Sequence, residues 1–317
     1  MNLNAFGVIR SRKSLLHLVI FAGLFVSLIL PAVALAQGGS GFSLTPYSLE
    51  AAANLPRFAF DAEPGQTIQS AVLVSNQSTI PVHVQIYPAD ARTAVNGNID
   101  FGRRSNVLTG VGRWVTLEQT DLNLAAGESQ LVLFSIRVPD TAQPGMHRAG
   151  IMAENVTPSV DEPATAQPGQ VRVKITFREG LNLRMTVPGP TKTEFAITGV
   201  VQTVENSDTI FDVQMANTGG EDVQMTAGQI QIFDAGGTAI GEQPIQISGL
   251  FMARGTVSHP IRLTGLLPEG HYSVQASVDY GGDAPAQWTS EFDMAPAAQK
   301  AAATEINRGF TLASPER

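Results

Sequence analysis

Apolar and polar residues alternate in short runs along most of this chain. Apolar side chains stand at every second position from Val132 to Val138, and the same period of two returns from Val82 to Tyr87 and from Tyr272 to Tyr280. Because successive side chains of a β-strand point to opposite faces of its sheet, each run predicts a strand with one buried face.

Turn-forming residues separate these runs. Asn96-Gly97 is typical of a tight hairpin, and Pro139 is expected to end a strand because proline cannot donate to a sheet ladder. Further turns are expected at Pro64-Gly65, Ala125-Ala126-Gly127-Glu128, Gln143-Pro144-Gly145, Asn217-Thr218-Gly219-Gly220 and Pro268-Glu269-Gly270. Short strands with almost no helical periodicity predict an all-β protein: two tandem immunoglobulin-like antiparallel β-sandwich domains after an N-terminal signal peptide.

Two strands are expected to close the first domain. Val171 to Arg178 and Leu181 to Val187 both alternate, and Glu179-Gly180 is expected to break them apart. Pro188-Gly189-Pro190 then predicts a domain boundary, because two prolines cannot continue a central ladder. The expected organisation is a signal peptide over residues 1–36, a first immunoglobulin-like domain over 37–187, a second over 188–295, and an Ala-rich tail over 296–317.

The first 36 residues have the three parts of a secretory signal. Basic residues Arg10, Arg12 and Lys13 precede an apolar run from Leu15 to Leu30, and Ala34-Leu35-Ala36 follows. This order predicts export and cleavage, so that the mature chain is extracytoplasmic: secreted, cell-surface or periplasmic. An uncleaved membrane anchor is the alternative, because the apolar stretch is long enough to cross a bilayer. No other stretch is, and the mature chain is expected to have no membrane span.

The charge balance indicates which classes of binding partner are expected. Without the signal, the chain has 17 basic and 28 acidic side chains, a net charge of −11. A chain this acidic is a poor ligand for nucleic acid, and no nucleic-acid partner is expected. Residues 37–187 hold 11 basic and 13 acidic groups, whereas residues 188–295 hold 3 and 13. The first domain is therefore the better candidate for binding an anionic ligand.

Several chemistries have no support in the sequence. Cysteine is absent, which excludes disulfides, thiol nucleophiles and cysteine metal sites. The five histidines have no partners at metal-ligand spacing, and no phosphate loop or nucleophile elbow is present. Asn96, Asn98 and Asp100 alternate loosely as in a calcium loop, but one carboxylate is too few, and an Asn-Gly turn is favoured. We expect a non-catalytic protein without metal or cofactor.

Four segments, Phe58–Gly65, Val74–Tyr87, Asn96–Asp100 and Trp114–Ile151, resemble a known family. From Phe42 to about Val187 the chain is similar to the peptidoglycan-binding domain of WxL-interacting cell-surface proteins, in which a second immunoglobulin-like domain also follows. The resemblance implies a non-catalytic surface protein that binds cell-wall glycan, here peptidoglycan, or wall-associated surface proteins. Members of that family typically end in a membrane span and a basic tail, from which the Ala-rich tail departs.

A weaker resemblance is to periplasmic pilus chaperones, which also have two immunoglobulin-like domains. It implies an alternative function, an assembly chaperone or structural subunit that acts by β-strand exchange. Strand exchange needs an exposed alternating apolar strand, and Val132 to Val138 is the candidate.

A stripe of basic residues is a first candidate binding site. Arg172, Lys174, Arg178 and Arg184 lie on the polar faces of the two closing strands. They are candidates for binding phosphate or carboxylate groups of the wall. The alternative is structural, because charged residues protect solvated or edge strands from aggregation.

A second candidate patch comes earlier in the chain. Arg103, Arg104 and Arg113 precede Trp114, whose ring is a candidate surface for stacking of a sugar. The alternative for Trp114 is a core position, because a large aromatic residue at the start of a strand usually packs inward.

Overall fold

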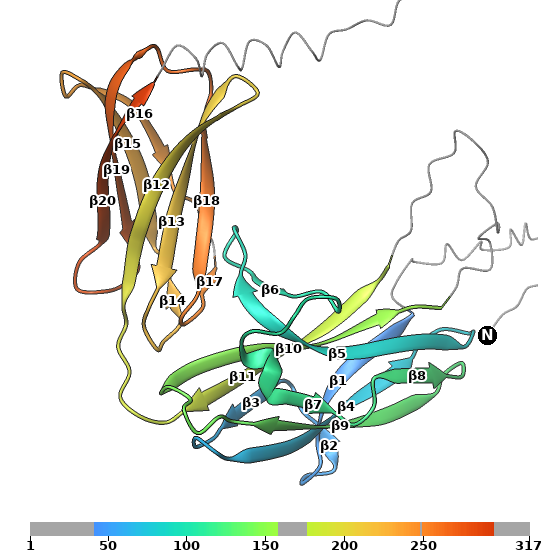
Figure 1. The fold of residues 1–317 in the computed structure, drawn as a ribbon. Coiled ribbons are helices and arrows are strands. Elements are labelled where there is room, and N and C mark those ends of the chain that lie inside the picture. Colours follow the sequence, from blue (N-terminus) through green and yellow to red (C-terminus); the bar gives the residue numbers. More distant parts are fainter. Residues whose placement is uncertain (1–40, 158–175, 248, 295–317) are drawn as a thin grey trace, which may run out of the picture. The chain divides into compact units, whose positions relative to one another are not determined.

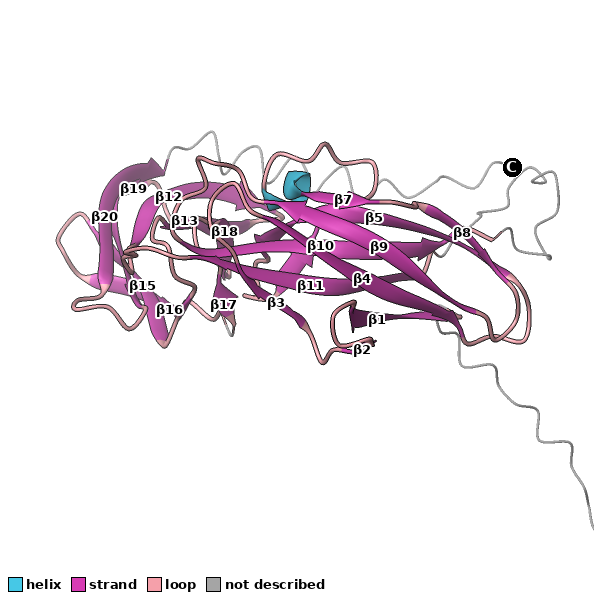
Figure 2. Ribbon diagram, turned by 90° about the horizontal axis from the view of Figure 1, so that it is seen from below, coloured by secondary structure: helices cyan, strands magenta, loops and turns pink. Residues whose placement is uncertain are grey.

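The computed structural model describes residues 41–157, 176–247 and 249–294, and the regular secondary structure in these ranges is almost entirely β-strand. Figure 2 shows strands throughout and a short helical turn beside β7, the 3-10 segment η1 (Val111–Trp114). The prediction of an all-β fold of immunoglobulin-like sandwiches is confirmed for the described residues. All of them lie in the compact unit Gly39–Arg317.

The first sandwich consists of two sheets, which Figure 1 shows one over the other. One sheet has the strand order β2-β1-β4-β9-β7, and all its pairs are antiparallel. Its strands are β1 (Phe42–Ser48), β2 (Ala53–Asn54), β4 (Thr67–Asn76), β7 (Val115–Leu117) and β9 (Ser129–Arg137).

The other sheet has the order β3-β11-β10-β5-β6, and β8 also pairs with β5. The pair β3 and β11 is parallel, whereas its other pairs are antiparallel. Its strands are β3 (Phe58–Asp61), β5 (Val82–Thr93), β6 (Ile99–Phe101), β8 (Asp121–Leu124), β10 (Gly145–Asn155) and β11 (Arg178–Val187).

Alternate side chains of the two sheets meet in one core. Phe58 and Phe134 are buried there, with ring centroids 5.2 Å apart in an edge-to-face contact. Val132 and Ile136 on β9 are buried in the same core, as the alternation predicts. Strand β9 pairs with β4 along one edge and with β7 along part of the other. The apolar row of the candidate exchange strand therefore packs within its own domain.

The second sandwich contains the strand orders β12-β13-β18, β16-β15-β19-β20 and β14-β17. Its core is a separate cluster that includes Phe211, Val213, Ile230 and Val274. Its strands are β12 (Phe195–Glu205), β13 (Asp208–Asn217), β14 (Val223–Gln224), β15 (Ala227–Asp234), β16 (Ala239–Pro244), β17 (Leu250–Phe251), β18 (Thr256–Leu263), β19 (Gly270–Asp279) and β20 (Ala286–Met294).

The expected break at Glu179-Gly180 is wrong. Both residues lie inside β11 and pair with Ala153 and Met152 of β10. A Cβ at Gly180 would lie 2.4 Å from the Met152 sulfur. The glycine therefore stands inside a strand, where it leaves room for the end of the Met152 side chain, and not in a turn.

Two turns have the backbone that their sequences predict. Asn96-Gly97 joins β5 to β6, with a positive φ of 81° at Gly97, and Gly127 has a φ of 73° in the turn before β9. Both values lie in the left-handed region that glycine adopts without strain. Asn96 Oδ1 accepts a 3.1 Å hydrogen bond from the Asn98 amide, which is the local bonding of an Asn turn.

Glycine also lets β6 lie close to the outer face of β10. A Cβ at Gly150 would be 2.4 Å from Cδ1 of Phe101, so the bare backbone leaves room for the aromatic ring. Phe101 packs there against the small buried cluster of Tyr87, Ala89 and Met152. This contact holds the end of β6 against the sheet. The segment that follows β6 begins at that point.

Some sequence predictions fall outside the described residues. They are the signal peptide over residues 1–36, the tail over residues 296–317, and the basic residues Arg172 and Lys174. The domain boundary at Pro188 to Pro190 stays a prediction. None of the helices in the described part of the chain is long and apolar enough to cross a membrane.

Candidate functional site

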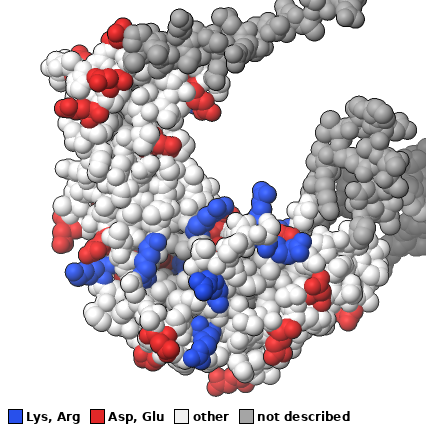
Figure 3. All heavy atoms as spheres, viewed as in Figure 1, with Lys and Arg blue, Asp and Glu red and all other residues white. Residues whose placement is uncertain are grey.

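The segment between β6 and β7, residues 102–114, contains three of the predicted site arginines and Trp114. We call it the arginine loop. Its sequence, GRRSNVLTGVGRW, has Arg103, Arg104 and Arg113 and no acidic residue. All three arginines are exposed, and Figure 3 shows Lys and Arg side chains gathered around β6 and η1 of the first sandwich.

One carboxylate holds the second half of the arginine loop. Asp90 on β5 accepts hydrogen bonds from the amides of Thr109 (2.7 Å), Gly110 (2.9 Å) and Gly112 (2.8 Å). The Gly102 amide also donates to the main-chain oxygen of Asp90 at 3.1 Å. Bonds from several amides to one ionised acceptor are strong, so Asp90 fixes the conformation of the loop.

We expect the Asp90→Ala change to loosen the arginine loop. Three amide donors lose their acceptor, which should lower the free energy of unfolding by about 1–3 kcal/mol. Hydrogen exchange should quicken at the Thr109, Gly110 and Gly112 amides. Asp234→Ala is the control, because Asp234 accepts two amide bonds in a turn of the second sandwich. Equal exchange in the loop of both variants would contradict this role of Asp90.

The structure brings Arg178 of the stripe to the arginine loop. Arg178 Nη1 donates a 3.2 Å hydrogen bond to the main-chain oxygen of Gly102. A hollow of about 300 Å³ lies beside this contact, lined by Arg103, Arg104, Ser105 and Glu154. Two basic groups that are more than seventy residues apart in the sequence thus meet at one surface.

Glu154 is the acidic residue of this cluster. Its carboxylate is 16 % exposed and lies 3.7 Å from Arg104 Nε, and it accepts a 2.7 Å hydrogen bond from the Tyr87 hydroxyl. Burial, together with the bond to Glu154, raises the pKa of Tyr87 to about 12, so the hydroxyl stays a neutral donor. Three arginines around one carboxylate leave the cluster positively charged, which favours an anionic ligand.

Of the other three residues in the basic stripe, the structure describes only Arg184. Arg184 is exposed on β11, six positions after Arg178 on the same strand face, and its cross-strand neighbour is Arg148. Arg148 is not free, because its guanidinium pairs with Asp222 at 2.6 Å and both side chains are nearly buried. The other two stripe residues lie outside the described ranges.

Trp114 lines a larger open hollow at the other end of the arginine loop. The hollow has a volume of about 570 Å³, and its lining residues are Thr109, Gly110, Val111, Arg113, Trp114, Arg137 and Pro139. Trp114 is half-buried against the first core, with its ring centroid 4.8 Å from that of His147. One side of Trp114 is therefore packed against the core, as the core alternative predicts, and the other side faces the hollow, where it is accessible to a ligand.

His147 supports Trp114 from within the sandwich. Its Nε2 lies 2.8 Å from the main-chain oxygen of Gln143. Burial lowers the pKa of His147, with nearby Arg254 acting in the same direction and the Gln143 contact opposing them. The ring is therefore neutral at pH 7, and its Nε2–H donates to the Gln143 oxygen.

The lowered pKa of His147 predicts a pH dependence. The unfolded chain binds a proton near pH 6.5, whereas the folded chain binds it only at lower pH. The stability from neutral His147 is therefore present above about pH 6.5 and is lost as the pH falls toward the folded pKa. We expect the free energy of unfolding to drop more from pH 7.5 to 5.5 in the parent than in His147→Gln. Equal drops in urea titrations of the two proteins would contradict this.

Sequence reasoning missed three residues that organise these surfaces: Asp90, Glu154 and Tyr87. Each lies on β5 or β10, and only Tyr87 stands in a segment singled out from the sequence, as the last residue of Val74–Tyr87. Among the described residues, no group of three or more His, Asp or Glu side chains is placed to hold a metal ion.

The exposed arginines and both hollows lie on the first sandwich. The segment from residue 49 to residue 155 matches the family model described as WxL Interacting Protein, peptidoglycan binding domain. The resemblance predicted from the sequence is confirmed for that segment. The match contains the whole arginine loop, whereas β11 with Arg178 and Arg184 lies outside it.

Solved structures similar to this chain include pilus chaperones. The class 5 fimbriae chaperone CfaA is 12% identical, over 80% of this chain and 99% of that chain, with a TM-score of 0.33. The CupB2 chaperone of Pseudomonas aeruginosa is 14% identical over 76% and 98%, with a TM-score of 0.32. The E. coli chaperone DraB is 13% identical over 80% and 96%, with a TM-score of 0.33. A comparison with curated proteins found no match.

Proposed function

We propose that this chain is an exported, non-catalytic surface protein whose first sandwich binds cell-wall peptidoglycan or a wall-associated protein. The observation that carries the proposal is that the arginine loop lies inside the segment that matches a peptidoglycan-binding domain. The family match and the positive surface therefore point to the same part of the chain. The secretory signal expected over residues 1–36 supports an extracytoplasmic location.

The chemistry of the surface fits a wall polymer. Stem peptides of peptidoglycan carry carboxylates, and the planar guanidinium group binds carboxylates through two parallel hydrogen bonds. The chain as a whole has a formal charge of −8, so general attraction to an acidic polymer is not expected. Binding then has to come from local positive surface, such as the cluster of Arg103, Arg104 and Arg178.

Co-sedimentation with purified peptidoglycan tests the proposal. Residues 37–317 should sediment with the polymer at low salt and less at high salt, because exposed ion contacts are screened over about 8 Å at physiological ionic strength. A protein of equal size and charge should stay in the supernatant. If both proteins partition alike, the peptidoglycan part of the proposal is wrong.

A further inference from the structure

The hollow beside Trp114 has the features of a specific subsite. Its volume of about 570 Å³ lies in the range of roughly 300–1,000 Å³ that small-molecule sites occupy. One wall is the part of the arginine loop that Asp90 holds by three amide hydrogen bonds. Because this wall is already ordered, a ligand does not have to order it on binding.

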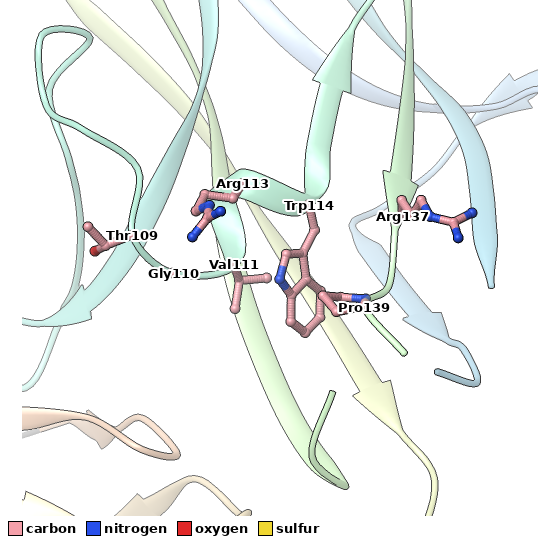
Figure 4. Close-up of a pocket in the computed structure, with 7 residues that line it drawn as sticks. All are labelled: Thr109, Gly110, Val111, Arg113, Trp114, Arg137 and Pro139. Atoms are coloured by element: carbon pink, nitrogen blue, oxygen red, sulfur yellow. The ribbon is translucent and has the colours of Figure 1, made fainter. Parts of the chain in front are cut away.

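Trp114 supplies an aromatic surface in this hollow. Its ring rests on His147, which leaves the ring fixed on one side. Figure 4 shows the indole nitrogen on the same side as Arg113 and Val111. A sugar ring with its apolar C–H face on the indole can place its polar groups toward that nitrogen, since indole combines a large apolar face with one N–H donor.

Arg113 supplies the charge. Figure 4 shows its guanidinium on the Thr109 side of the hollow, facing the edge of Trp114 that carries the indole nitrogen, whereas that of Arg137 points away. Across the described ranges, Arg113 has no ion pair with a carboxylate. A guanidinium without a protein partner, beside an aromatic platform, is suited to a ligand carboxylate.

We infer that Trp114 and Arg113 form a muropeptide subsite. An N-acetylated sugar ring stacks on the indole, and a carboxylate of the attached stem peptide pairs with the guanidinium. This inference rests on the wall-binding function proposed above and specifies which chemical unit of the polymer the hollow takes. A sugar without the peptide meets only Trp114, and the peptide without the sugar meets only Arg113.

Tryptophan fluorescence can report on this hollow alone. The chain has two tryptophans, and the other one, Trp288, has an indole N–H that is buried without a hydrogen-bond partner among the described residues. Replacing it by phenylalanine removes an unpaired donor and should leave the fold intact. The Trp288→Phe protein, residues 37–317, is therefore the parent for all titrations.

Three soluble probes separate the two halves of the subsite. They are N-acetylmuramyl-L-alanyl-D-glutamate, N,N′-diacetylchitobiose, and the dipeptide L-alanyl-D-glutamate. We expect the muropeptide to change the Trp114 emission at concentrations roughly tenfold or more below those of either other probe, which corresponds to one added charge-assisted contact. Arg113→Gln should abolish that preference, so that the muropeptide binds no better than the chitobiose.

Arg137→Gln is the matched control, because it removes the same charge from the rim of the hollow while the guanidinium points away. It should keep the preference. Muropeptide and chitobiose curves that coincide in the parent, no emission change with any probe, or equal losses in the two arginine variants would each overturn the subsite. Sedimentation of the same parent with peptidoglycan is scored separately. Sedimentation without a muropeptide preference rejects the subsite alone, whereas muropeptide binding without sedimentation keeps the subsite and rejects the broader function.

Discussion

Replacing Arg103, Arg104 and Arg178 together by serine should weaken binding to peptidoglycan by roughly a hundredfold at low salt. These side chains meet around the Gly102 carbonyl and the smaller hollow, and each charge-assisted hydrogen bond to an ionised group contributes about 1.5–3 kcal/mol when it forms. Solvent exposure reduces that contribution, so the expected hundredfold counts about 1.5 kcal/mol for each of two of the three arginines. Binding that remains should depend less on salt.

The matched control removes the same number of charges elsewhere. Arg57, Lys192 and Arg262 are exposed, and their replacement by serine changes the net charge equally. This control should keep the parental affinity in co-sedimentation isotherms, and each protein should keep the parental circular dichroism spectrum. If the two triple variants bind alike, general electrostatics and not the arginine cluster carries the binding.

Asn76→Ala should lower the free energy of unfolding of the first sandwich by about 3 kcal/mol. Asn76 is buried at the end of β4, and its Nδ2 donates to the main-chain oxygens of Ile80 (2.8 Å) and Ala125 (2.8 Å). Its Oδ1 accepts from the amide (2.9 Å) and the hydroxyl (2.7 Å) of Ser78. Alanine leaves these groups without their partner, and each buried group left unpaired costs about 1–3 kcal/mol.

The second sandwich contains an asparagine with the same kind of contacts as Asn76. Asn217 ends β13 and bonds the Glu221 oxygen (2.8 Å) and the Gly219 amide (3.0 Å) in the same manner. In the Trp288→Phe background, urea unfolding followed by Trp114 emission should show a lower midpoint for Asn76→Ala. Asn96→Ala, in an exposed turn, should change it little. Similar midpoints for the Asn76 and Asn96 variants would contradict the role of the buried amide.

The strands could be predicted because their evidence is local. Alternation from Val132 to Val138 and glycine at Gly127 each depend on a few neighbouring residues, and the structure has the strand and the turn where they predict them. Gly180 was misread because its reason is non-local. A glycine in sequence favours a turn, but here it makes room for Met152 on the next strand, and only the strand register shows that.

The candidate site also has a part that could be predicted from the sequence and a part that could not. Arg103, Arg104 and Trp114 were found because they stand close together in a chain with few cations. The hydrogen bond from Arg178 to Gly102 and the support of the loop by Asp90 could not be predicted, because pairing of β5, β10 and β11 brings those residues together. A single acidic residue on a strand gives no signal in sequence that it will hold a loop by its amides.

The most direct test of the account is a binding isotherm of residues 37–317 on peptidoglycan freed of attached proteins and anionic polymers. Removing those polymers leaves the glycan and its stem peptides as the available ligand. We expect saturable binding. Soluble muropeptides that muramidase releases from the same material should displace the protein from the polymer. Absence of saturable binding, or binding that appears only when anionic polymers are left attached, would contradict peptidoglycan recognition by the first sandwich.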